Sequence, residues 1–263
     1  MLYFTYALNA ALMIALPLLL GVFLAKRCGM RWALFGVGAI TFVASQAVHI
    51  PLNHGLTLLF AKKILPLPPL AWQLPFNAVL LGLTAGLCEE IARYVAYRRF
   101  LKDARSWREA LMFGAGHGGV EAMILGALAG LGLLNMVLLR NEGLLPLSLP
   151  AETREAVRET VAGYWSAPWH ASLLGAFERV WAMCLHLSLA VMVLQALTRG
   201  RLVWLGAAIG WHAAVNAIAI FGVGTWGPYW TEAALGACGL VSVAIVYALR
   251  PGDAERPEQG TTD

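Results

Sequence analysis

The segment that decides the fold is 70–97, LAWQLPFNAVLLGLTAGLCEEIARYVAY, an apolar stretch that carries Glu89, Glu90 and Arg93 near its end. About 20 consecutive apolar residues suffice for a helix to cross the hydrocarbon core of a bilayer, so this segment is long enough to span it. A charged side chain at that depth is costly, and it therefore indicates a functional site or an internal ion pair.

The composition agrees with a membrane protein. The chain has 263 residues, of which 59% are hydrophobic and 13% charged, and its mean hydropathy is +0.67. A soluble domain is about a quarter charged. Apolar runs of about 20 residues recur along the whole length, which predicts an all-α, polytopic transmembrane helical bundle. A transmembrane barrel would show short alternating segments instead.

About seven spans are predicted, at 3–25, 33–60, 70–97, 109–139, 173–197, 202–222 and 231–249. We expect Pro51 to interrupt the second span, and 151–159 to form a short surface helix within the polar segment 140–172. Residues 1–250 are predicted to be a single domain. The tail 251–263 is too polar to fold, and it is expected to be disordered and cytoplasmic.

The loops predict the orientation, because Lys and Arg are in excess on the cytoplasmic side of membrane proteins. One side of the membrane would hold Lys26, Arg27, Arg31, Arg98, Arg99, Lys102, Arg105, Arg108, Arg199, Arg201, Arg250 and Arg256, and the other only Lys62, Lys63, Arg140, Arg154 and Arg158. We therefore expect the N-terminus outside and the C-terminus in the cytoplasm. The net charge of +4 needs no nucleic-acid partner, since the basic residues flank spans.

The intramembrane polar residues are predicted to lie at similar depths in the membrane. At about 1.5 Å per helical residue, Glu89 and His117 lie roughly 14 Å from the basic inner ends of their spans. The same measure places His212 roughly 17 Å and His186 roughly 20 Å deep. Four spans therefore place a carboxylate and three imidazoles in one slab of the bundle.

Helical spacing adds further partners to this slab. His117 and Glu121 are four residues apart, as are His212 and Asn216, so each pair shares a helix face. Arg93 lies four residues from Glu89 and three from Glu90, and it can pair with either carboxylate.

Carboxylates, imidazoles and an amide suit hydrolysis of a carbonyl compound. One carboxylate would accept a proton from water, the histidines would hold a metal or polarise the carbonyl, and Asn216 would donate to the oxyanion. Zinc is the common metal that fits His and carboxylate ligands. The spacing is not HExxH, and neither GxSxG nor a CxxC pair occurs. A structural ion pair and interhelical hydrogen bonds through histidine are the alternatives for the individual residues.

Three motifs in order, Glu89-Glu90-Ile-Ala-Arg93, Phe113-Gly-Ala-Gly-His117 and His212-Ala-Ala-Val-Asn216, resemble those of the CAAX-prenyl protease and bacteriocin-processing (CPBP) membrane peptidases. His117-Gly-Gly-Val-Glu121 and the Glu178-Arg179 pair ahead of His186 are similar to the YhfC-type intramembrane metalloproteases of bacteria, a branch of that superfamily. The resemblance covers most of the chain.

The resemblance implies a multi-pass membrane endopeptidase in the bacterial plasma membrane, acting on a membrane protein or peptide. It implies that Glu89 activates water, with Glu90, Arg93 and Asn216 as the other catalytic candidates. The candidate ligands of a metal, expected to be Zn²⁺, are His117, His186, His212 and Glu121. The first motif is one residue shorter than the family's EExxxR, which leaves open whether Glu89 or Glu90 is the base. A proton- or cation-coupled transporter and a non-catalytic membrane scaffold are the alternatives.

Overall fold

The computed structural model describes residues 1–140 and 150–251, and all regular structure in these ranges is helical. The helices are α1 (Leu2–Cys28), α2 (Trp32–Ala61), α3 (Leu70–Arg99), α4 (Trp107–Leu139), α5 (Ala151–Ser166), the 3₁₀ turn η2 (Ala171–Leu173), α6 (Leu174–Thr198), α7 (Val203–Thr225) and α8 (Pro228–Ala248). Within these ranges, seven segments are long and apolar enough to cross a membrane, α6 being counted together with η2. The predicted all-helical, seven-span bundle is thereby confirmed, and the orientation stays a prediction.

Two details of the predicted elements are wrong. Pro51 does not interrupt α2, which runs through it without a break, as α1 runs through Pro17 and α3 through Pro75. Proline is tolerated inside membrane helices because neighbouring groups satisfy the carbonyl it frees. The surface helix α5 extends to Ser166, beyond the predicted 151–159. The predicted disordered tail, apart from Pro251, lies outside the described residues.

Local sequence signals determine where several helices begin and end. Ser106 caps α4 with a capping box, in which its hydroxyl accepts from the Glu109 amide and the Glu109 carboxylate accepts from the Ser106 amide. At the end of α1, Gly29 adopts a left-handed conformation with φ of 66°, a conformation that glycine reaches without steric cost.

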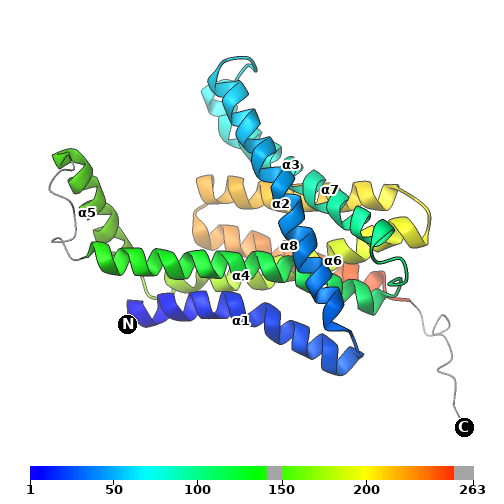
Figure 1. The fold of residues 1–263 in the computed structure, drawn as a ribbon. Helices are drawn as coiled ribbons and strands as arrows, with labels where there is room; N and C mark the ends of the chain where they lie inside the picture. The colour runs from blue at the N-terminus through cyan, green and yellow to red at the C-terminus, as the bar shows by residue number, and fades with distance from the viewer. Residues whose placement is uncertain (141–149, 252–263) are drawn as a thin grey trace, which may run out of the picture.

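The long helices form a bundle whose partners are often far apart in sequence. α3 packs along α7, α1 packs along α4, and α6 lies against α4 and α8. α2 crosses this group obliquely, so that the C-terminal half of α2 and the N-terminal half of α3 extend beyond the other helices (Figure 1). α5 projects from the far end of α4 (Figure 1). The arrangement places α3, α4, α6 and α7 around a common centre.

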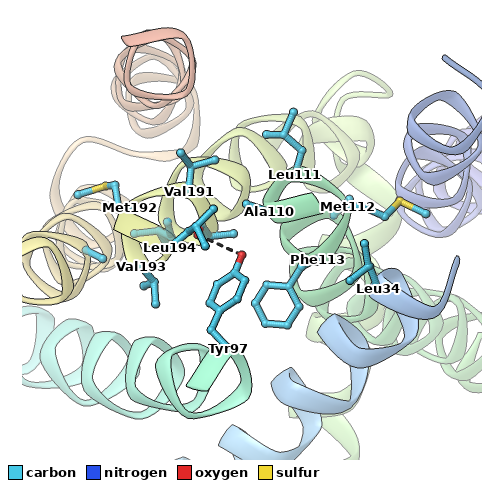
Figure 2. Packing of buried hydrophobic residues seen from close by; sticks show 14 of the residues in the cluster. Leu34, Tyr97, Ala110, Leu111, Met112, Phe113, Val191, Met192, Val193 and Leu194 are labelled. Atoms are coloured by element: carbon cyan, nitrogen blue, oxygen red, sulfur yellow. Dashed lines mark hydrogen bonds between the residues drawn. The ribbon is translucent and has the colours of Figure 1, made fainter. Parts of the chain in front are cut away.

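The apolar core lies at the end of α3, the start of α4 and the end of α6. Tyr97, Phe113, Leu189 and Val193 are fully buried there and belong to one apolar cluster. Tyr97 and Phe113 lie side by side in this cluster, with Leu34 of α2 at its margin (Figure 2). The Tyr97 hydroxyl donates a hydrogen bond to the Ala190 carbonyl at 3.3 Å, which satisfies the polar atom of this layer.

Glycines allow the backbones of the central helices to approach closely. A Cβ on Gly116 of α4 would lie 2.0 Å from the Phe35 carbonyl of α2, and one on Gly38 of α2 would lie 2.1 Å from the Phe113 carbonyl. On α3, a Cβ on Gly82 would lie 2.4 Å from the Ala213 carbonyl of α7. Small residues are favoured at membrane helix interfaces for this reason.

We therefore expect Gly116→Ala to lower the free energy of unfolding by about 1–3 kcal/mol, because the added methyl group overpacks a backbone contact. The matched control is Gly132→Ala on the same helix, where nothing lies within 4 Å of the added Cβ. That variant should keep or slightly raise stability, since alanine is the better helix former. The melting temperature of purified protein in detergent measures both, and equal melting of the two variants would contradict the close contact.

Candidate active site and metal centre

The predicted site residues converge at the common centre of α3, α4, α6 and α7. Glu89, Glu90 and Arg93 come from α3, and all three residues are buried. His117 comes from α4, His186 from α6 and His212 from α7, and all three are buried. The imidazole rings of His117 and His186 lie 5.6 Å apart between centroids, and those of His186 and His212 lie 5.7 Å apart. Helices distant in sequence thus bring the three histidines side by side.

The helix α4 can lie this close to His186 because the residue after His117 is glycine. A Cβ on Gly118 would lie 2.5 Å from Cδ2 and 2.7 Å from Cβ of His186. The imidazole of His186 therefore packs directly on the α4 backbone, and any side chain at position 118 would displace it.

Arg93 takes Glu90, and not Glu89, as its partner. Its Nη1 donates to both carboxylate oxygens of Glu90 at 2.9 Å. His212 Nδ1 donates to Glu90 Oε1 at 2.7 Å. Both Glu90 and Arg93 are fully buried. The Glu90 carboxylate is thus held by two donors from two helices and has no exposed surface.

His186 is the junction between this ion pair and a second acidic cluster. Its Nδ1 lies 2.6 Å from Nη2 of Arg93, and its Nε2 lies 2.6 Å from Oε2 of Glu121. Because a guanidinium only donates and a carboxylate only accepts, His186 accepts at Nδ1 and carries its proton at Nε2. Glu121 also accepts from Arg179 Nη1 at 2.8 Å, and Arg179 donates in turn to Glu178.

Helical spacing did not predict these partners of Glu121 and Arg179. Glu121 shares a face with His117, four residues earlier, yet it bonds to His186 of α6. Arg179 follows Glu178 directly and bonds to it, but it also reaches Glu121 of α4. The Glu178-Arg179 pair therefore belongs to the same hydrogen-bonded network as the predicted site.

Glu89 has a different environment from its neighbour Glu90. Its Oε2 lies 3.1 Å from Nε2 of His117, and its Oε1 accepts from Nε2 of Gln46 at 3.2 Å. Its side chain keeps 7% exposure, and it lines a polar pocket of about 70 Å³. Adjacent residues on a helix point about 100° apart, so one carboxylate faces the ion pair and the other faces the pocket.

The polar pocket gathers the remaining site residues. Its lining includes Glu121, Arg179, His186, His212 and Asn216 together with Glu89. Asn216 is partly buried, and among the described residues it makes no hydrogen bond with its side chain. It is the only predicted site residue that lines the pocket without joining the hydrogen-bonded network of the described residues.

Residues of α2 near Glu89 are absent from the predicted site. Gln46 donates to Glu89, His49 Nδ1 lies 3.2 Å from Oε1 of Gln46, and Asn53 Nδ2 lies 2.9 Å from Nε2 of His49. His49 also lies 3.3 Å from the Thr84 hydroxyl. The signal that could have revealed this stripe is the spacing of three polar residues at i, i+3 and i+7 on one face of an apolar span.

The donor set fits a metal ion. Ligand atoms of Glu89, His117 and His186 lie within 4.8 Å of one another, and zinc accepts both imidazole nitrogen and carboxylate oxygen. Nδ1 of His117 is buried, and none of the described residues is its hydrogen-bond partner, which an ion or a water would explain. Both ring nitrogens of His186 are engaged, so it would ligate only after releasing Arg93 or Glu121.

The other two predicted ligands, His212 and Glu121, lie outside this closest group. His212 nevertheless has a feature of metal-binding histidines, since its Nδ1 donates to the carboxylate of Glu90. Glu121 holds His186 and Arg179, and it therefore orients a candidate ligand.

Comparison with known proteins identifies the family of this bundle. The family model described as YhfC intramembrane metalloprotease matches residues 12–232. A relative from Bacillus subtilis (strain 168), described as uncharacterized membrane protein YhfC, is 30% identical over 216 residues, which cover 81% of this chain and 82% of the relative. No solved structure matches significantly. The chain, a multi-pass membrane protein with a buried Glu–His–Arg centre, thus belongs to the YhfC intramembrane metalloprotease family.

Proposed function

We propose that this protein is an intramembrane peptidase that hydrolyses a peptide bond in a membrane-embedded or membrane-proximal segment of its substrate. The observation that carries the proposal is the position of Glu89, which contacts His117 and lines a polar pocket inside an apolar bundle. Membership of a family described as intramembrane metalloproteases supports it.

Glu89 is the better candidate than Glu90 for the base that takes a proton from water. Glu90 is fully buried, and Arg93 and His212 occupy its oxygens. A proton taken up there would weaken the ion pair with Arg93. Glu89 faces the pocket, and its two partners are the neutral amide of Gln46 and His117. Because the two glutamates have these different partners, Glu89 is free to act in proton transfer, while Glu90 and Arg93 position His186 and His212.

Asn216, another residue that lines the pocket, can stabilise the developing oxyanion. Asn216 lies one helical turn from His212 on α7, and both side chains line the pocket with Glu89. The Asn216 amide has two donors, and an amide aimed at a tetrahedral intermediate is an effective oxyanion donor. We assign this role to Asn216, with His212 beside it held in orientation by Glu90.

Glu89 and His117 would hold a metal ion, joined by His186 once that imidazole has released Arg93 or Glu121, because the ligand atoms of these three residues lie closest together. Such an ion would polarise the scissile carbonyl and lower the pKa of a water. The carboxylate of Glu89 can ligate through one oxygen and accept a proton through the other.

Transport of protons or cations is less well supported by the geometry. A coupled transporter needs polar groups on both sides of its central site. Toward one end of the bundle, the site is followed directly by the buried apolar layer of Tyr97, Phe113 and Leu189.

The first test compares Glu89→Gln with the wild type in membranes incubated in water enriched in ¹⁸O. Hydrolysis places one ¹⁸O atom in each new carboxyl terminus, and mass spectrometry of membrane-derived peptides detects it. We expect labelled termini with the wild type and their loss with Glu89→Gln, which is nearly isosteric but cannot accept the proton. The control His54→Gln alters an exposed histidine of α2 and should keep full labelling. Labelled termini that persist in Glu89→Gln would refute the assignment of the base.

The second test measures bound metal in purified protein. We expect about one zinc ion per chain in the wild type, as in a catalytic site with three protein ligands. His117→Ala should lose the ion because it removes a ligand at the centre, whereas His54→Ala should retain it. Retention of the metal by His117→Ala would exclude the centre formed by Glu89, His117 and His186.

A further inference from the structure

We infer that the polar pocket is a water chamber that opens toward the end of the bundle where α6 and α8 begin, and that the opposite end of the site is sealed. Its role, the supply of water to Glu89, rests on the proposed hydrolysis. Its existence is a property of the bundle and can be tested without catalysis.

The sealed end is formed by one residue from each of the four central helices. One turn beyond Arg93, His117, His186 and His212, in the same direction along the bundle, the chain places Tyr97, Phe113, Ala190 and Ala208, all with 0% exposure. Tyr97 and Phe113 face each other at 4.8 Å between ring centroids and pack against the buried end of α6 (Figure 2). Water arriving from this end would have to cross a close-packed apolar layer.

The opposite direction along the same helices is polar and open. One turn from His117, His186 and His212 on that side lie Glu121, Ala182 and Asn216, and all three line the pocket. The side chain of Glu121 is 24% exposed. Glu178, which also lines the pocket, is 36% exposed and lies about 12 Å further along α6 than His186. Exposure therefore rises steadily from the site toward the start of α6.

The pocket has the size and the unpaired donors that bound water requires. Its volume is about 70 Å³, and one water needs about 10–15 Å³ by such a measure. Arg179 is 6% exposed, and its Nε is buried with no hydrogen-bond partner in the part of the chain that the structure describes. Nε1 of Trp181 is buried without one as well. Both residues line the pocket, so bound water would satisfy two donors that residues 1–140 and 150–251 leave unpaired.

The lipid-facing side of α3 offers water no comparable route. The groove between α2 and α3 is lined by apolar residues apart from Thr41, Ser45 and Cys88. The hydroxyls of Thr41 and Ser45 donate to backbone carbonyls of their own helix. The groove between α2 and α3 is therefore apolar, whereas the pocket toward α6 and α8 is polar.

Radiolytic hydroxyl-radical footprinting of the full chain in lipid vesicles tests the inference with a probe generated from water itself. Modification rates are normalised to those of the protein unfolded in detergent and urea. We expect Trp181 and Cys238, which line the pocket, to be modified several-fold faster than Tyr97 and Phe113 of the sealed layer. Equal rates in the two groups, or faster modification of the sealed layer, would overturn the water chamber.

The direction of the opening is tested with a membrane-impermeant, cationic methanethiosulfonate in sealed vesicles of known sidedness. Three variants each retain one native cysteine: Cys238 in the pocket, Cys88 in the apolar groove, or Cys28 at the end of α1. The start of α1 and the start of α6 lie at the same end of the bundle, because Ser172 is hydrogen-bonded to Thr5. Cys28, at the other end of α1, therefore marks the opposite end of the bundle. The reagent requires a thiolate in water. We expect Cys238 to react from the face opposite to the one that labels Cys28, and Cys88 to be several-fold slower than either.

Labelling of Cys238 only from the face that labels Cys28 would overturn the direction of the opening. Because neither measurement depends on catalysis, a dry pocket would refute the water route alone. The peptidase proposal would then still be decided by the ¹⁸O experiment with Glu89→Gln.

Discussion

The buried ion pair between Arg93 and Glu90 is the interaction on which the rest of the centre depends. Both side chains have 0% exposure, and the guanidinium donates to both carboxylate oxygens. Such a pair is tolerated in an apolar interior only when its geometry is good and further hydrogen bonds complete it. Those bonds come from His212 and go to His186, so the pair ties α3 to α7 and α6. Removal of either charge would leave the other uncompensated among three helices.

The ion pair also separates the two adjacent glutamates. Glu90 faces the pair and is held there, while Glu89 faces the pocket beside His117. The same separation extends to the histidines, because His186 is held between Arg93 and Glu121, whereas His117 keeps a nitrogen that no described residue pairs with. The groups around the ion pair thus make the centre rigid, whereas Glu89 and His117 keep atoms that can take part in chemistry. A substitution around the ion pair should affect stability and activity together, and one at Glu89 or His117 chiefly activity.

The two sides of the site along the bundle differ in packing and in polarity. Glycines on α2, α3 and α4 bring the helix backbones into contact, which leaves little space around the imidazoles. On one side of the site, large apolar side chains fill the remaining volume, and on the other side acidic and basic side chains line a small pocket. This asymmetry allows an apolar bundle to hold a polar site that reaches water from one direction.

The sequence by itself determined the helical class, the seven spans and nearly all the members of the centre. Apolar length defines a span, and an ionisable residue at membrane depth is too costly to be incidental. This reasoning did not identify Gln46 and His49, because an uncharged amide, or a histidine near the end of a span, is a weaker indication of a functional site than a charged residue at membrane depth.

Only the tertiary structure decided which residues pair. Arg93 could reach either glutamate by helical spacing, and it pairs with Glu90 because α6 and α7 place His186 and His212 on that side. Glu121 shares a helix face with His117 but bonds to His186 of another helix. Spacing within one helix specifies a face, whereas the partner on that face is chosen by the rotation and approach of the neighbouring helices. Those depend on contacts between residues far apart in the chain.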